Sequence, residues 1–272
     1  MDRSIVDSTP IVRLPRWTLF GLAAVVMGLW LLYTPLGALG KADAIGYAVC
    51  HRIELRSFQL GDRPLPLCSR CTGMYLGAVA AIAFGLVLGR TQSGLFPPRR
   101  VLWTLGAMSV PFAIDGVNSF LHFFPTAPHL YEPTNTLRLV TGLLLGIGLG
   151  TVVLAGFAQT AWQRLNREAP LRSLAELGGV VVIVGLVAVM VLSENPLLLY
   201  PLALLSGAGV LLVLTGVHTT LALLVFRREN QAQSWRDLAL PASAGLTLAM
   251  LQIGAIDVVR YLTTGTWSGF VL

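Results

Sequence analysis

The chain has 272 residues, 55% of them hydrophobic and only 12% charged, and its mean hydropathy is +0.73. These values exclude an ordinary soluble domain, in which about a quarter of the residues are charged. The net charge of +6 lies in short basic blocks between apolar runs. This pattern is typical of membrane topology, and no nucleic-acid motif accompanies it, so no nucleic-acid partner is expected.

Seven apolar segments predict an all-α, polytopic integral membrane helix bundle. Each is near the roughly 20 residues that cross a bilayer, and none shows the period-2 alternation of barrel strands. The segments are residues 17–39, 72–89, 101–124, 135–158, 177–192, 197–226 and 238–262. Only Glu194, Asn195 and Pro196 separate the fifth segment from the sixth, which predicts a tight helical hairpin there.

The first segment is too long for a signal-peptide core of about 7 to 15 residues, so we interpret it as an uncleaved anchor. Four arginine clusters alternate with the segments and predict a cytoplasmic N-terminus in a multi-pass protein of the cell membrane. The clusters are Arg3, Arg13, Arg16; Arg90, Arg99, Arg100; Arg164, Arg167, Arg172; and Arg227, Arg228, Arg236.

The loop between the first two segments departs from this pattern. It should be external, yet it carries five cations: Lys41, Arg52, Arg56, Arg63 and Arg70. This number indicates a folded, functional loop, although a longer loop can simply tolerate charge.

All three cysteines of the chain lie in this loop and at the start of the next segment, within a stretch of 22 residues, which predicts that they belong to one site. Cys68 and Cys71 are spaced to share one metal ion, and Cys50 with His51 supplies the other half of a tetrahedral site, with zinc the first expectation. His51 need not bind, in which case the fourth position would hold water. The alternatives are a Cys68–Cys71 redox pair resolved by Cys50, or a structural disulfide.

The third segment carries Asp115, Asn118 and His122 on one helical face. A carboxylate in an apolar helix is costly, and such residues usually face a polar cavity or a partner. We therefore expect a functional group here, with a hydrogen-bonded helix cross-link as the alternative.

The fourth segment opens with a helix-start signal, Pro133 followed by Thr134 and Asn135. Arg138 lies one turn inside, so the guanidinium and the helix N-terminus together predict an anion site. A salt bridge from Arg138 to Asp115 or Glu132 is the alternative.

These features, with His129 and Asp257, all map to one face of the membrane. We therefore predict one external cavity, a funnel shallow at Glu132 and Arg138 and deepest at Asp115, with the cysteine loop at its opening. Asp257 and Arg260 are expected to lie at the same end, where they can pair with each other.

The sequence also resembles a family of predicted membrane proteins, domain of unknown function 2085. The resemblance is carried by residues 50–52 with 54–58, by 67–77, by Asp115–Gly116, and by 132–138 with Thr141–Gly142. It covers roughly the first 150 residues and implies that these positions form the family's site, without supplying a reaction. We accordingly expect a four-helix core over residues 1–158 and three further helices over 159–272.

Together the features favour a membrane-embedded enzyme with a thiolate-bound zinc, acting on an anionic lipid or isoprenoid headgroup. In this hypothesis Asp115 or Glu132 is the general base, with His122 as a further acid or base, and Arg56, Asn118, Asn135 and Arg138 bind substrate. The alternatives are a metal or small-anion transporter, a thiol–disulfide oxidoreductase, and a structural or interaction protein with a metal clip.

Overall fold

The computed structural model describes residues 16–124 and 126–270, which form a bundle of α-helices with one short hairpin. The predicted fold class is confirmed. Arg3 and Arg13 of the first arginine cluster lie outside the described residues. The helices are α1 (Arg16–Tyr33), α2 (Gly37–Val49), α3 (Ser69–Val87), α4 (Arg99–Leu121), α5 (Asn135–Ala161), α6 (Leu174–Leu192), α7 (Pro196–Val225) and α8 (Ala239–Thr264). Strands β1 (Gln59–Leu60) and β2 (Arg63–Pro64) pair antiparallel.

Five described helices, α3, α5, α6, α7 and α8, are long and apolar enough to cross a membrane. A sixth span results if α1 and α2 count as one broken helix. α4 has the length, with 23 residues, but Asp115 and Asn118 lower its apolar character. The chain is therefore a multi-pass membrane protein, while seven spans and the cytoplasmic N-terminus stay predictions.

The single first helix expected over residues 17–39 is wrong. α1 ends at Tyr33 and α2 begins at Gly37, and the two helices are bent by 106°. Pro35 accounts for the break because it offers no backbone N–H to continue the helix. Lys41 then caps the broken end, since its Nζ donates to the carbonyl of Thr34 at 3.0 Å. One of the five unexpected loop cations is thereby explained.

α3 and α5 form the centre of the bundle and run parallel, each beginning at the same end. Glycines make this pairing very close: a Cβ at Gly73 would lie 2.3 Å from the carbonyl oxygen of Leu139, and one at Gly146 would lie 2.2 Å from that of Met74. Close backbone approach through small residues is the usual basis of helix packing in membranes. The two helix N-termini therefore lie beside each other.

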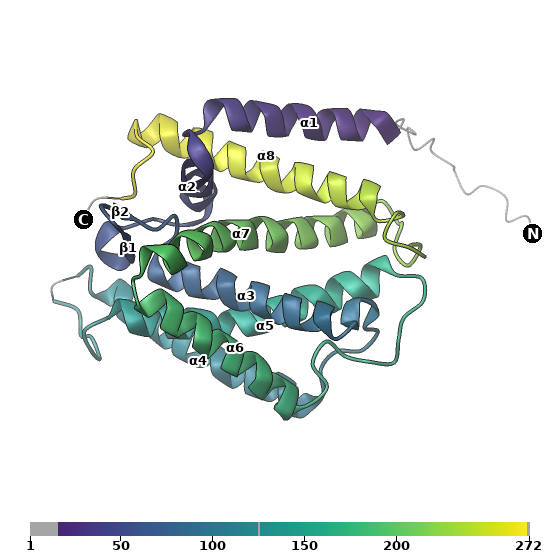
Figure 1. Ribbon diagram of the computed structural model, residues 1–272, viewed down its shortest axis with the longest axis horizontal. Helices are drawn as coiled ribbons and strands as arrows, with labels where there is room; N and C mark the ends of the chain where they lie inside the picture. Colours follow the sequence, from purple (N-terminus) through teal and green to yellow (C-terminus); the bar gives the residue numbers. More distant parts are fainter. Residues whose placement is uncertain (1–15, 125, 271–272) are drawn as a thin grey trace, which may run out of the picture.

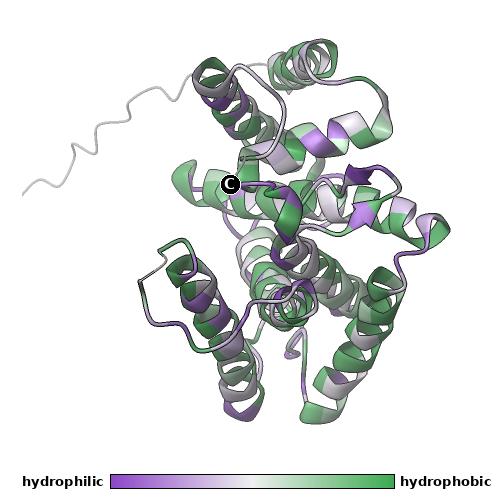
Figure 2. Ribbon diagram, turned by 90° about the vertical axis from the view of Figure 1, so that its left-hand side faces the viewer, coloured by the Kyte–Doolittle hydropathy of each residue, from purple (hydrophilic) through white to green (hydrophobic). Residues whose placement is uncertain are grey.

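The remaining helices are layered around this pair (Figure 1). α7 packs on α3 and α5, α8 on α7, and α1 on α8, while α4 and α6 cover the opposite side. The connections α3–α4, α5–α6 and α7–α8, which hold three of the arginine clusters, gather at one end. The β1–β2 hairpin lies at the other end, and Figure 2 views the bundle from there.

Two local predictions are confirmed. Thr134 caps α5, its hydroxyl accepting a hydrogen bond from the N–H of Leu137 at 3.2 Å. The α6–α7 turn is only three residues long, and Asn195 caps α7 by accepting from the N–H of Leu197 at 3.0 Å.

Candidate functional site

The cysteine loop connects two helix ends. Cys50 is the C-cap of α2 and Cys68 is the N-cap of α3, with the 3-10 turn η1 (Glu54–Arg56) and the β1–β2 hairpin between them. Cys71 follows in the first turn of α3. The loop is thus folded and its cysteines are fixed by helix ends rather than by a mobile segment.

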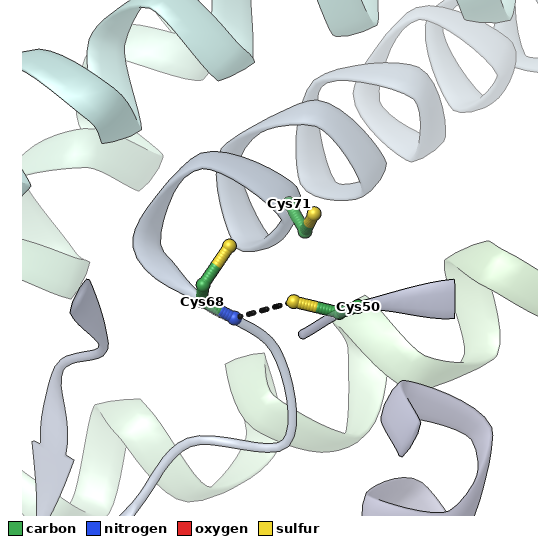
Figure 3. A group of neighbouring side chains, drawn as sticks. All are labelled: Cys50, Cys68 and Cys71. Atoms are coloured by element: carbon green, nitrogen blue, oxygen red, sulfur yellow. Dashed lines mark hydrogen bonds between the residues drawn. The ribbon is translucent and has the colours of Figure 1, made fainter. Parts of the chain in front are cut away.

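The three sulfur atoms lie within 4.8 Å of one another, and all three thiols are free (Figure 3). The sulfur of Cys50 accepts hydrogen bonds from the backbone N–H groups of Arg52 and Cys68, each at 3.4 Å. Such bonds favour a thiolate. The His51 ring reaches the sulfur of Cys50 through Nδ1 at 3.5 Å but is not part of the compact group of ligand atoms.

The thiol groups of the cluster differ in pKa. Hydrogen bonds from Cys68 and Cys71 lower the pKa of the Cys50 thiol well below its usual value. The hydrogen bond to Cys50 conversely raises the pKa of Cys68 to about 12. Of these two thiols, Cys50 therefore loses its proton more easily.

The back of the loop is held by a residue whose role was not predicted. Arg260, from α8, donates to the carbonyls of Tyr47, Cys50 and His51 at 2.5, 2.6 and 3.2 Å. Asp257 instead accepts from the indole of Trp30 at 3.2 Å, so the expected Asp257–Arg260 pair does not form among the described residues. α8, beyond the predicted four-helix core, thus positions the cysteine loop.

Two further loop arginines bind Asp43 of α2. Arg52 pairs with its carboxylate at 2.8 Å and donates to the carbonyl of Trp267 at 3.1 Å, and Arg63 pairs with the same carboxylate. These residues and the C-terminal segment line a cavity of about 710 Å³. Neither Asp115 nor Arg138 lines it, so the predicted funnel is not this cavity.

Asp115 is fully buried on the predicted face of α4, but its partner is Arg70, not Arg138. Arg70 pairs with the carboxylate through two nitrogens, and Tyr131 donates to it at 3.3 Å. Arg70 also reaches the hydroxyl of Ser119 at 2.9 Å. The alternative of a salt bridge from Arg138 to Asp115 or Glu132 is therefore not found among the described residues.

Arg138 is instead a buried cation, 7% exposed, which pairs with no carboxylate of the described residues. One of its terminal nitrogens donates to the side chain of Asn135 at 3.0 Å, and its Nε has no hydrogen-bond partner. Arg56 and Arg70 are near enough that their positive charges act on it. Asp115, which pairs with Arg70, also acts on Arg56 and Arg138, so the three guanidinium groups share one carboxylate and these four side chains carry a net positive charge.

Asn135 and Ser119 connect this arginine group to the loop. Asn135 donates to the carbonyl of Leu55 at 3.3 Å, beside Arg56, while Arg56 donates to the carbonyl of Ser119 at 3.3 Å. Burial lowers the pKa of Arg56, and the like charge of Arg70 adds to the effect. The predicted substrate-binding residues Arg56, Asn135 and Arg138 are thus brought together.

The remaining predicted residues meet at the turn between α4 and α5. His122, the C-cap of α4, lies 3.3 Å from the carboxylate of Glu132, and His129 lies 3.7 Å from it. Asn118, one turn earlier, holds this turn: its amide donates to the carbonyl of Tyr131 at 2.8 Å and accepts from the N–H of Leu130 at 2.7 Å. Asn118 therefore positions the turn.

This geometry can be compared with known proteins. A family described as "Predicted membrane protein (DUF2085)" matches residues 50–152. An uncharacterized protein of Methanothermobacter thermautotrophicus is 33% identical over 104 residues, which are 38% of this chain and 83% of the relative. The chain belongs to the DUF2085 family. An uncharacterized protein of Methanocaldococcus jannaschii is 24% identical over 123 residues, 45% of this chain and 72% of the relative. No solved structure matches.

The DUF2085 match begins at Cys50 and ends inside α5, so it includes the three cysteines, the arginine group and the α4–α5 turn. Asp43 and Arg260, which hold the loop from behind, lie outside it. In this chain, helices outside the family match therefore support a site that lies inside it.

Proposed function

We propose that this DUF2085 protein binds a zinc-type metal ion at Cys50, Cys68 and Cys71 and an anionic group of phosphate type beside it. The observation that carries the proposal is the convergence of three sulfurs, two of them buried, at the start of α3. A tetrahedral zinc ion with Zn–S bonds of about 2.3 Å keeps its sulfurs about 3.8 Å apart. The three sulfurs, all within 4.8 Å of one another, are compatible with that separation.

The hydrogen bonds to Cys50 support metal binding because metal-bound thiolates are commonly held by neighbouring N–H donors. Within the described chain only these three side chains form the group, and structural zinc sites normally have four protein ligands. A bound ion with three thiolates would supply Lewis-acid chemistry at its open position. This favours an enzyme over a structural clip.

The anion site is supported by the buried charge of Arg138. A guanidinium in this environment is costly unless its charge is compensated, and its unpaired Nε offers a donor to a ligand. Arg56 and Arg70 add charge, and the parallel N-termini of α3 and α5 add two favourable helix dipoles. Phosphate matches the planar guanidinium fork, as an anionic lipid or isoprenoid headgroup or as the free ion.

In this proposal Asp115 orients Arg70, because it is fully buried and already paired. The exposed Glu132 is then the more accessible candidate for a general base. The proposed enzyme thus uses the metal and Glu132 for catalysis and the arginine group to bind an anionic headgroup.

Metal binding is tested on detergent-purified, reduced full-length protein by elemental analysis with free-thiol counting. We expect zinc that a mercurial thiol reagent releases, and we expect Cys68→Ser and Cys71→Ser each to lose it, because each removes a ligand. Full retention of mercurial-sensitive metal in both variants would contradict the proposal. A disulfide without metal would instead favour thiol–disulfide chemistry.

Anion binding is tested by calorimetry with inorganic phosphate and, separately, with nanodiscs of anionic or neutral lipid. Arg138→Ala is expected to weaken binding by about 10- to 100-fold, the equivalent of one charged hydrogen bond of about 1.5–3 kcal/mol. Arg138→Lys should recover part of the loss, since lysine keeps the charge but not the fork. Arg172→Ala, at the opposite end, is the matched control. Equal affinities in the Arg138→Ala and Arg172→Ala variants would refute the site.

Transport of a metal ion or small anion is a second candidate, favoured by the broken pair α1 and α2. Discontinuous helices often carry ion sites in transporters, and here the second half-helix ends at Cys50. Zinc flux into proteoliposomes would separate transport from catalysis.

A further inference from the structure

We propose that His122, His129 and Glu132 form a second metal site, for a zinc-type divalent cation, at the turn between α4 and α5. One nitrogen from each histidine and one carboxylate oxygen lie within 4.8 Å of one another. Two histidines and one glutamate are a ligand set of zinc sites that keep a position open for water or substrate. This site uses none of the cysteines and does not depend on the cysteine metal site. With a cation bound here, Glu132 is a ligand and no longer a free general base.

The hydrogen bonding of His122 supports a cation rather than a simple ion pair. Its Nδ1 lies 3.1 Å from the backbone carbonyl of Asn118, and a carbonyl can only accept, so Nδ1 carries the hydrogen. In the neutral ring, Nε2 then has a lone pair. This atom is buried, faces the Glu132 carboxylate at 3.3 Å and makes no hydrogen bond within the described chain.

In the neutral form of His122, two acceptors face each other, and a divalent cation satisfies both. A histidine held through Nδ1 by a backbone carbonyl is also the usual arrangement of a metal-binding imidazole. The rings of His122 and His129 lie 4.1 Å apart between centroids, close enough for both to bind one ion.

The ligands are preorganised by Asn118. The backbone carbonyl of Asn118 orients His122. Its side chain fixes the backbone at Leu130 and Tyr131, which lie between His129 and Glu132 in the sequence. A helix end and a clamped turn thus hold the three ligands without the metal, which lowers the cost of ordering them on binding.

The test is a cobalt titration of the metal-stripped, reduced full-length protein in detergent. Cobalt bound at the cysteines shows thiolate-to-metal charge-transfer absorption, whereas cobalt bound at nitrogen and oxygen ligands does not. We expect a second equivalent without that absorption, which His122→Ala and His129→Ala each abolish while the charge-transfer band is unchanged. His218→Ala is the matched control, because His218 makes the same type of Nδ1 contact to a helix carbonyl, in α7.

If the histidine variants fail to fold, Glu132→Gln still tests the site, because Glu132 is 83% exposed and its replacement should not disturb folding. It is expected to weaken cobalt binding at this site by at least about tenfold, and Asn118→Ala by about 10- to 100-fold. The proposal would be overturned if the cobalt equivalent that lacks the charge-transfer band were bound equally well by the parent protein, His122→Ala and Glu132→Gln. It would also be overturned if all bound cobalt showed the charge-transfer band. A band that is missing while the histidine-dependent equivalent persists would refute the cysteine site alone.

Discussion

Replacing Asp115 with alanine is expected to lower the free energy of unfolding by about 3 kcal/mol. This is the lower end of the range for breaking a buried ion pair. The carboxylate is fully buried, whereas Arg70 keeps 18% of its side chain exposed and can recover part of its solvation. Arg70 would lose both bonds to the carboxylate, and Tyr131 would lose its acceptor.

The measurement is unfolding of the purified protein in mixed detergent micelles, followed by circular dichroism. Asp62→Ala, at the exposed β1–β2 turn, is the control and should change stability by less than about 0.5 kcal/mol. The double variant Arg70→Ala with Asp115→Ala should lose less than the sum of the single variants, because the pair is coupled. Additive losses would show that Arg70 and Asp115 do not stabilise each other.

Replacing Gly146 with alanine is expected to cost about 1–3 kcal/mol, since it overpacks the α3–α5 contact. The added Cβ would lie 2.2 Å from the carbonyl oxygen of Met74 and 2.9 Å from the Cα of Gly77. Both neighbours are backbone atoms of a packed helix, so the clash is relieved only if α3 and α5 move apart. The cysteines and Arg70 at the start of α3 would move with it.

Gly148→Ala is the matched control on the same helix, because a Cβ there meets no atom within 4 Å. It should leave the free energy of unfolding within about 0.5 kcal/mol of the parent protein. The same micelle unfolding assay compares the two variants. Equal stabilities would mean that α3 and α5 pack less closely in the membrane than described above.

The sequence alone determined the features that depend on local composition. Long apolar runs predicted the helical membrane fold because lipid leaves backbone groups no other partner, and Pro133 with Thr134 correctly marked the start of α5. The structure brings Cys68 and Cys71 together with Cys50, as their spacing predicted, and buries Asp115 and Asn118 on one face of α4, as their periodicity predicted. The roles of these residues stay predictions.

The tertiary structure decided which residues become partners. Arg70 in the first turn of α3, rather than Arg138 of α5, pairs with Asp115 of α4, and local periodicity cannot predict a contact between residues 45 positions apart. Arg260 reaches the cysteine loop from a helix more than 200 positions along the chain, and the bend at Pro35 turns α2 across the bundle end. Long-range pairing depends on how helices pack, and several packings satisfy the same apolar pattern, so only the fold could select among them.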